Sequence, residues 1–180
     1  RKNYFFLCTL EESYSKKDQT TSLTVWDIKK AGVLAHLKLH QIKGQNVTNV
    51  DMWSNNFIAI SSSKGEMELW YIGPSQKARS YSNEKKSAWT LQLCWYWNFQ
   101  KEVGSLTSVS FSPFQNSHLA LTCSEGLFFV RDFNSKGPPT TIEKRFKVPQ
   151  TKVYDLIWSH IHENQLYLVT SKEIGFYDIS

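Results

Sequence analysis

The chain has 180 residues, of which 21 are Lys or Arg and 16 are Asp or Glu, giving a formal net charge of +5. Hydrophobic residues make up 41% and charged residues 21%, so the chain can bury a sizeable core, which excludes a disordered or collagen-like polypeptide. The length favours one domain or part of a larger one, and so mild a positive charge permits anionic partners without requiring them.

The first apolar run, residues 4–10, is too short to cross a membrane. Glu11 and Glu12 follow it at once, without the small-residue cleavage pattern of a signal peptide. We therefore expect a soluble protein with no membrane insertion. The three cysteines, Cys8, Cys94 and Cys123, show no C-x-x-C spacing, which favours a reducing compartment over a disulfide framework or a zinc site.

Along the rest of the chain, short runs rich in Val, Ile, Leu, Phe, Trp and Thr alternate with clusters of Ser, Asn, Gly and Pro. Helical periodicity is nearly absent, and this pattern is typical of an all-β chain. Four segments end alike, with an apolar residue followed by Trp26, Trp70, Arg131 or Tyr177. The intervals between these four residues are 44, 61 and 46 positions, which indicates a repeat.

Three further elements recur in a fixed order within this repeat. The first has apolar residues at its relative positions 1, 4 and 6, and it lies at 47–53, 106–113 and 153–159. The second is an apolar run before a turn, at 57–61, 119–123 and 166–170. The third is a more variable strand after the shared ending, at 33–40, 89–99 and 141–148. The repeating unit is therefore predicted to contain four strands.

These motifs resemble the WD-repeat family of β-propellers, in which each repeat of about 40 to 45 residues forms one four-stranded blade. The resemblance covers essentially the whole chain. It implies an all-β fold, a partial β-propeller of about four antiparallel four-stranded blades, two complete and two incomplete. The implied divisions are blade one at 1–40, blade two at 45–99 with an insertion at 73–88, blade three at 104–148 and blade four at 151–180. The rest of its own propeller would then be needed to close the ring.

The repeats diverge from the family pattern at its polar positions. Only the first repeat keeps the Trp-Asp pair, as Trp26-Asp27. The family's Gly-His dipeptide, whose imidazole joins a buried network with the blade Trp and a Ser or Thr, is replaced by Gly44-Gln45, Gly104-Ser105 and Pro149-Gln150. We expect apolar packing between blades to supply most of the stability instead.

No catalytic or cofactor signature is present, and the eight glycines never form even a G-x-G. We therefore predict no catalytic, cofactor-binding or metal-binding residues. The nearest approach to metal-ligand spacing is His160-x-His162-Glu163, which lies in an expected turn between strands. A solvated turn is the favoured interpretation, and Cys123 is predicted to be a core residue.

The insertion at 73–88 is basic, with Lys77, Arg79, Lys85 and Lys86 opposed only by Glu84. Together with Tyr96 on the adjoining strand, these four residues are the candidate partner-binding residues. One interpretation is a docking loop that phosphorylation could regulate, and the other, which is favoured, is a solvated loop without a partner.

The strand after the insertion has apolar residues at alternate positions. They are Trp89, Leu91, Leu93, Trp95, Trp97 and Phe99. A single apolar face predicts packing in the core rather than base stacking. As the outermost strand of its blade, this segment would have one free edge that could accept a partner strand.

The resemblance and the absence of catalytic motifs predict a non-catalytic protein–protein interaction scaffold in a larger intracellular assembly, with other protein subunits as partners. We expect a cytoplasmic or cytoskeletal location, although ciliary, coat and nuclear complexes all use such blades. The alternative is a nucleic-acid-binding propeller subunit, using basic rim residues such as Lys144, Arg145, Lys147 and Lys152. A propeller enzyme would need polar side chains that converge on the central channel.

Overall fold

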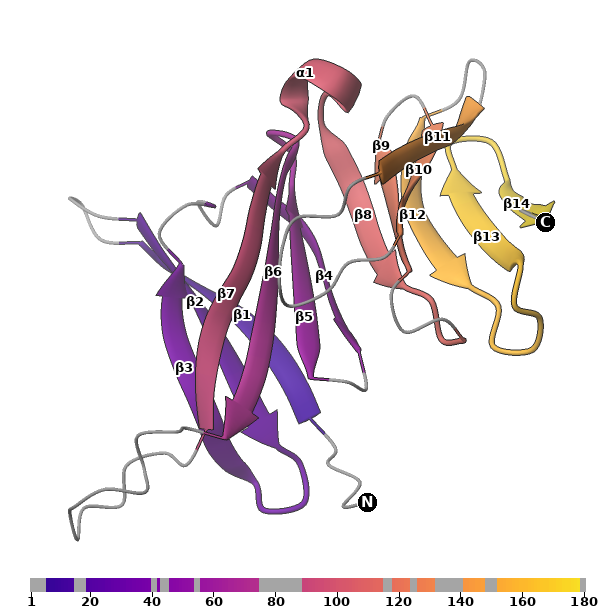
Figure 1. Cartoon of the computed structure of the whole chain (residues 1–180). Helices are drawn as coiled ribbons and strands as arrows, with labels where there is room; N and C mark the ends of the chain where they lie inside the picture. The colour runs from indigo at the N-terminus through magenta and orange to yellow at the C-terminus, as the bar shows by residue number, and fades with distance from the viewer. Residues whose placement is uncertain are drawn as a thin grey trace, which may run out of the picture.

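The structure of the chain is a computed structural model that describes residues 6–14, 19–39, 42, 46–53, 56–74, 89–114, 118–123, 126–131, 141–147 and 152–178. Its strands form four antiparallel sheets of three, four, four and three strands, which we call blades one to four (Figure 1). This arrangement confirms the predicted all-β partial propeller. The residue limits predicted for the blades fall partly outside the described residues and stay predictions.

Each blade is a simple meander, so neighbours in sequence pair in space. Blade one contains β1 (Phe6–Tyr14), β2 (Gln19–Asp27) and β3 (Gly32–Leu39). Blade two contains β4 (Val47–Trp53), β5 (Phe57–Ser62), β6 (Glu66–Pro74) and β7 (Trp89–Asn98). Blade three contains β8 (Leu106–Phe111), β9 (Leu119–Cys123), β10 (Gly126–Arg131) and β11 (Thr141–Lys147). Blade four contains β12 (Val153–Trp158), β13 (Gln165–Thr170) and β14 (Ile174–Asp178).

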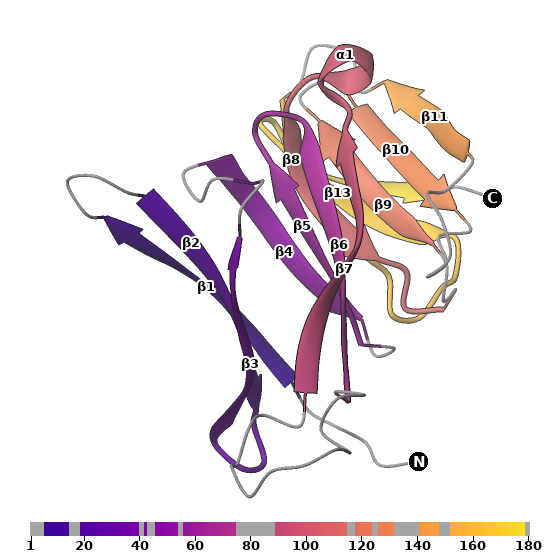
Figure 2. The ribbon, with the colours of Figure 1, turned by 60° about the vertical axis from the view of Figure 1, so that its left-hand side comes forward.

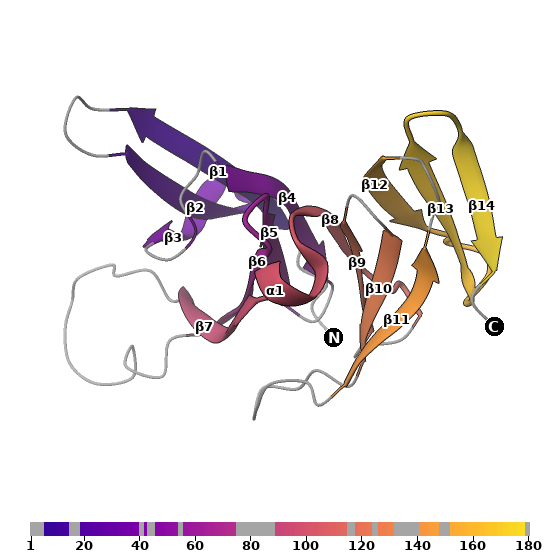
Figure 3. The ribbon, with the colours of Figure 1, turned by 90° about the horizontal axis from the view of Figure 1, so that it is seen from above.

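The first strands of blades two, three and four lie next to one another, and we call β4, β8 and β12 the innermost strands. Seen from above, the blades follow one another in chain order around these strands (Figure 3). Among the described residues the helical structure is α1 (Gln100–Val103), a single turn between β7 and β8. The described part of the chain holds no helix long and apolar enough to cross a membrane.

The innermost strands share a β-bulge that explains their apolar pattern. In each one the register shifts by one residue near the start, between Val47 and Asn49, Leu106 and Ser108, and Val153 and Asp155. In a regular strand positions 1 and 4 would point to opposite faces, but one extra residue brings positions 1, 4 and 6 onto the same face. The spacing seen in the sequence therefore encodes the bulge.

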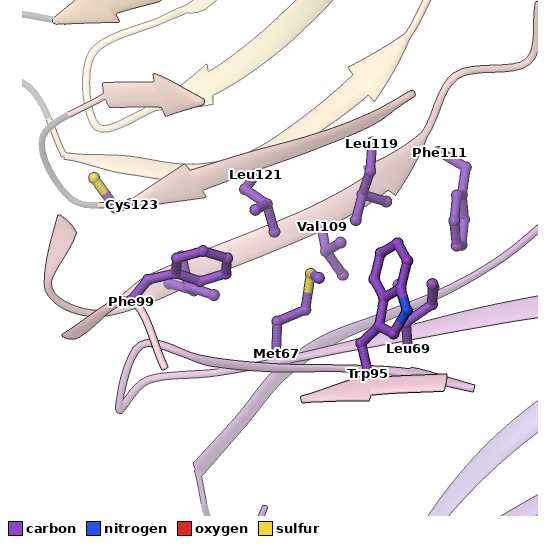
Figure 4. Close-up of a cluster of buried hydrophobic side chains, with 11 residues drawn as sticks. Met67, Leu69, Trp95, Phe99, Val109, Phe111, Leu119, Leu121 and Cys123 are labelled. Atoms are coloured by element: carbon purple, nitrogen blue, oxygen red, sulfur yellow. The ribbon is translucent and has the colours of Figure 1, made fainter. Parts of the chain in front are cut away.

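The cores lie between blades. Blades two and three enclose one cluster, in which Met67, Leu69 and Trp95 of blade two face Val109 and Leu121 of blade three (Figure 4). Cys123 is fully buried in the same cluster, as predicted. A second cluster joins blade one to blade two, and a third joins blade three to blade four. Burial of apolar surface between successive sheets thus holds the arc together.

The prediction of one continuous apolar face on β7 is wrong. Leu69 pairs with Trp95 and Trp70 pairs with Leu93, which leaves Cys94 as an extra residue in the ladder. Because of this bulge, the side chains before and after Cys94 fall on opposite faces of the sheet. Trp89, Leu91 and Leu93 pack toward blade one, whereas Trp95, Trp97 and Phe99 pack toward blade three. The predicted core role of these residues is confirmed, but they belong to two different hydrophobic clusters. The strand β7 itself is the outer edge of its sheet (Figure 2).

Candidate interaction surfaces

The four basic residues of the insertion, Lys77, Arg79, Lys85 and Lys86, lie outside the described residues, so their proposed role stays a prediction. The strands on either side are described, and they pair up to Gly73 with Thr90 and Pro74 with Trp89. The chain therefore leaves blade two after Pro74 and re-enters it at Trp89, two residues that pair with each other. Trp89 is the first residue of the outermost strand, β7.

Tyr96 lies on β7 with 38% of its surface exposed. Its phenol donates a hydrogen bond to Oε1 of Glu66 at 2.9 Å. Partial burial and the adjacent Glu66 carboxylate raise the pKa of the Tyr96 phenol, which keeps it protonated. Tyr96 lies seven positions beyond Trp89, on the order of 20 Å along the strand, so it is remote from the residues that flank the insertion.

The outer edge of β7 is interrupted by its bulge. In the order β4-β5-β6-β7 this strand is the last, so its outer edge pairs with no other strand of that sheet. The extra residue, Cys94, lies mid-strand, and burial raises the pKa of its thiol. Bulges of this kind hinder regular strand addition at an edge. A partner strand would therefore have to pair with one half of β7 at a time.

Of the basic residues proposed for nucleic-acid binding, Lys152 is described in full, and its ammonium group lies 5.3 Å from the centre of the Tyr154 ring. Lys144, Arg145 and Lys147 lie on β11, but the placement of their side chains is outside the described part of the structure. Of these four basic side chains, only that of Lys152 lies within the described part of the structure.

The His160-x-His162-Glu163 segment forms an exposed turn between β12 and β13, as predicted. The hydroxyl oxygen of Ser159 accepts the backbone N–H groups of Ile161 and His162 and closes this turn. Across the described residues, no three His, Cys, Asp or Glu side chains gather in a way that could hold a metal ion.

A belt of polar side chains joins the innermost strands, and the sequence analysis did not identify it. At relative position 3 of the three strands stand Asn49, Ser108 and Asp155. The Asn49 amide donates to the Ser108 hydroxyl at 2.7 Å, and that hydroxyl donates to Oδ1 of Asp155. Asn49 also reaches Asp155 directly at 3.4 Å. These bonds connect three successive blades along their innermost strands, so we call this set of polar residues, with Asp51 and Ser110, the axial belt.

Two positions further along, Asp51 makes a second connection. Its Oδ2 accepts the Ser110 hydroxyl at 3.0 Å and the backbone N–H of Phe111 at 2.7 Å, both from blade three. Burial raises the pKa of Asp51, and the nearby Asp155 carboxylate adds to the increase. The signal that could have revealed the belt is a polar residue at position 3 of all three innermost strands and at position 5 of the first two.

The tryptophans at the shared strand endings have different acceptors. In blade one the indole N–H of Trp26 donates to the Thr9 hydroxyl at 3.0 Å, so one bond of the expected polar network survives. In blade two the indole N–H of Trp70 donates to Oε2 of Glu68 at 2.7 Å. Glu68 is only 1% exposed, and its Oε1 accepts the backbone N–H of Ile42, which links blade two to the segment that follows blade one.

No family model matches the sequence, and no curated protein matches it. Solved structures do: Sqt1 from Chaetomium thermophilum is 15% identical, with a TM-score of 0.64 over 96% of this chain and 40% of that chain. Sqt1 from Chaetomium thermophilum bound to the N-terminus of the ribosomal protein L10 is 14% identical, with a TM-score of 0.64 over 96% and 42%. The Cps50 (Swd1) β-propeller domain from Myceliophteria thermophila is 13% identical, with a TM-score of 0.58 over 99% and 53%.

These similarities are low in sequence but extend over nearly the whole chain in structure, so they show the fold alone: the four blades are part of a β-propeller. The chain spans about half, or less, of the length of the structures it matches.

Proposed function

We propose that the chain is part of a non-catalytic β-propeller scaffold that binds protein partners. The observation that carries the proposal is the axial belt, where Asn49, Ser108 and Asp155 bond to one another across three blades. Ser110 bonds separately to Asp51 across two of them. These polar side chains bond between blades and hold the blades together. A rigid fold whose axial polar side chains bond to one another is suited to binding protein partners through its outer surface.

A further observation supports protein partners. One similar structure holds the N-terminus of a ribosomal protein, so a propeller of this architecture can bind a peptide segment. The three cysteines show no C-x-x-C spacing, a pattern that suits a reducing compartment. We therefore propose that the scaffold belongs to a larger intracellular assembly in the cytoplasm or on the cytoskeleton, with cilia, coats and nuclear complexes as the candidate settings.

The experiment is to purify the tagged protein from its own cells and to measure its size by gel filtration and light scattering, with and without nuclease. We expect a complex with other protein subunits that survives nuclease treatment. Elution as a monomer would contradict the scaffold. A complex that disperses with nuclease and weakens steeply with salt would favour the nucleic-acid alternative instead.

The insertion is proposed as one docking element of this scaffold. Changing Lys77, Arg79, Lys85 and Lys86 to Ser should reduce complex formation, because charge at a rim acts on association rate and selectivity. The matched control changes four exposed lysines on other parts of the surface, Lys30, Lys38, Lys64 and Lys172, to Ser. Equal recovery of partners by both variants would show that the insertion is a passive loop.

A further inference from the structure

Two turns, one after β8 and one after β12, hold an exposed apolar side chain in the same way. Phe114 and Ile161 are the ninth residues of their repeat elements, and they are 42% and 81% exposed. The seventh residue in each is a buried serine, Ser112 or Ser159. The serine hydroxyl oxygen accepts the backbone N–H of Phe114 at 3.3 Å and that of Ile161 at 3.2 Å. We call Phe114 and Ile161 the apolar pair.

The two turns also close alike. The backbone N–H of Ser112 donates to the carbonyl oxygen of His118 at 3.0 Å. The backbone N–H of Ser159 donates to the carbonyl oxygen of Gln165 at 2.9 Å, and both intervals are six residues. The turns therefore hold the apolar pair in position before any partner binds, which lowers the entropy cost of binding.

The apolar pair belongs to neighbouring blades. Blade two has a shorter turn, because Met52 pairs with Ile58, and the equivalent pairs in blades three and four are two residues further apart. Blade three packs against blade two on one face and against blade four on the other. The exposure of Phe114 is therefore a property of the turn itself, with a blade packed on either side.

The two turns lie at the same end of the molecule. β8 and β12 run in the same direction, because Ser108 bonds to Asp155 and, further along both strands, the Ser110 carbonyl accepts the indole N–H of Trp158. Both turns follow these strands at the end opposite α1 (Figure 1). Packed sheets lie about 10 Å apart, so equivalent turns on neighbouring blades have about the same separation. The apolar pair thus offers two anchor points about 10 Å apart.

The chemistry around the apolar pair favours one segment of another protein. Residues 112–118 contain no Asp, Glu, Lys or Arg, and residues 159–165 contain only Glu163. Nucleic acids and anionic membranes are held by clustered cations, which these two turns lack. Two side chains also present far less than the about 800 Å² per partner that a stable interface between two copies needs.

The backbone of the turns favours a helix over an extended segment. The N–H groups of Ser112, Phe114, Ser159 and Ile161 already donate within the turns. They are therefore not free to pair with an added strand, whereas a helix satisfies its own backbone groups. Two turns of helix, about seven residues, span about 11 Å, which matches the separation of the anchor points.

We propose that the apolar pair binds an amphipathic helix of a partner protein, with apolar side chains seven residues apart over Phe114 and Ile161. This inference rests on the proposed function, because it names a surface and a partner class for the same scaffold. Exposed His160 and His162 flank Ile161 and contact the polar margin of the helix. The contact is mainly apolar, so it depends little on salt.

The first experiment places the photo-cross-linker p-benzoylphenylalanine at position 114 or at position 161 of the full-length protein in its own cells. Mass spectrometry identifies the cross-linked peptides. We expect both positions to capture one segment of one other protein, at sites about seven residues apart in an amphipathic helical pattern. The control position is Lys64, exposed in the β5–β6 turn, which lies against α1 at the other end. It should not capture that segment.

The second experiment measures the affinity of a synthetic peptide of the captured segment for the purified full-length protein by fluorescence anisotropy. Phe114→Ser with Ile161→Ser should weaken binding about tenfold or more, because it removes both anchors. The matched control, Phe114→Leu with Ile161→Leu, keeps an apolar surface and should bind within about threefold of the unchanged protein. Both side chains are exposed, so neither variant should change the Tm appreciably.

Several outcomes would overturn the proposal. They are capture of a second copy, of nucleic acid or of lipid, capture of different proteins from the two positions, and no product above the Lys64 control. Equal peptide affinity of the Ser variant and the unchanged protein would also overturn it. If the protein still elutes as a complex in any of these cases, the inference fails and the scaffold stands. Elution as a monomer would instead contradict the scaffold itself.

Discussion

The indole N–H of Trp70 donates to the carboxylate of Glu68, two residues earlier on the same strand, inside the core between blades one and two. In blade one the equivalent indole, that of Trp26, bonds to Thr9 on the neighbouring strand. The register shows why blade two differs. Thr9 pairs with Thr24, and the matching pair in blade two is Ile60 with Glu68. Glu68 supplies the acceptor that Ile60 cannot.

The first prediction concerns this exchange. Glu68→Ala should lower the free energy of unfolding by about 2 to 5 kcal/mol, because it removes a buried acceptor from both Trp70 and the Ile42 backbone. The double variant Ile60→Thr with Glu68→Thr recreates the blade-one pair. The double variant should be more stable than the sum of the two single changes in free energy of unfolding predicts, as measured by urea unfolding. Strict additivity would show that the Trp70 bond contributes nothing specific.

The innermost strands were predictable because their apolar positions 1, 4 and 6 match a strand with one bulge. The change of face on β7 was not, because the bulge falls at Cys94, and no Gly or Pro marks it. Glu68 was missed for a related reason. In the run EMELWYI at 66–72 it alternates with apolar residues and looks solvent-exposed, yet blade one covers it. Local alternation predicts a strand, but only tertiary packing decides which faces are buried.

The axial belt could not be predicted in the same way. Asn49, Ser108 and Asp155 occupy equivalent positions, but their side chains differ in each repeat. A search for identical residues passes over such positions. Their bonds depend on three strands that are distant in sequence lying side by side.

The second prediction concerns Gly65, which has a φ of +74° in the turn between β5 and β6. A Cβ there would lie 2.4 Å from the Gly104 carbonyl oxygen and 2.8 Å from the Gln100 Cα, both backbone atoms. Gly104 has the same φ, but a Cβ there meets no atom within 4 Å, so it is a matched control. Both Ala variants introduce backbone strain, and Gly65→Ala should cost about 1 to 3 kcal/mol more. Thermal unfolding measures the difference, and equal Tm values would contradict the close approach of α1.

The third prediction concerns the axial belt. Asp155→Ala removes the acceptor that the Ser108 hydroxyl, the Asn49 amide and the Leu156 backbone N–H share. Ser108 and Leu156 are buried and Asn49 is half-buried, so we expect a loss of about 1 to 3 kcal/mol in the free energy of unfolding. Asp155→Asn keeps one acceptor oxygen and should cost less. If both variants unfold at the same urea concentration as the unchanged protein, the belt does not hold the blades together.

The last prediction is a pH dependence that arises from Asp51. Burial raises the pKa of its carboxyl group above the ordinary value of 3.8. Between 3.8 and that raised pKa, the folded protein binds the proton more tightly than the unfolded chain does. The contribution of Asp51 to stability is therefore fully present below the unfolded pKa, and it declines as the pH rises through the folded pKa.

The comparison that isolates this effect is with Asp51→Ser, because Ser110 occupies the same position in blade three. Urea unfolding of both proteins between about pH 4 and about pH 7 gives their free energies of unfolding. The difference in favour of the unchanged protein should become smaller as the pH rises. The control is Glu11→Ser, at an exposed position on β1. If the advantage over Asp51→Ser instead grew with pH, the bonds from Ser110 and Phe111 would outweigh the burial of the carboxylate, and Asp51 would be a net stabilising anion at neutral pH.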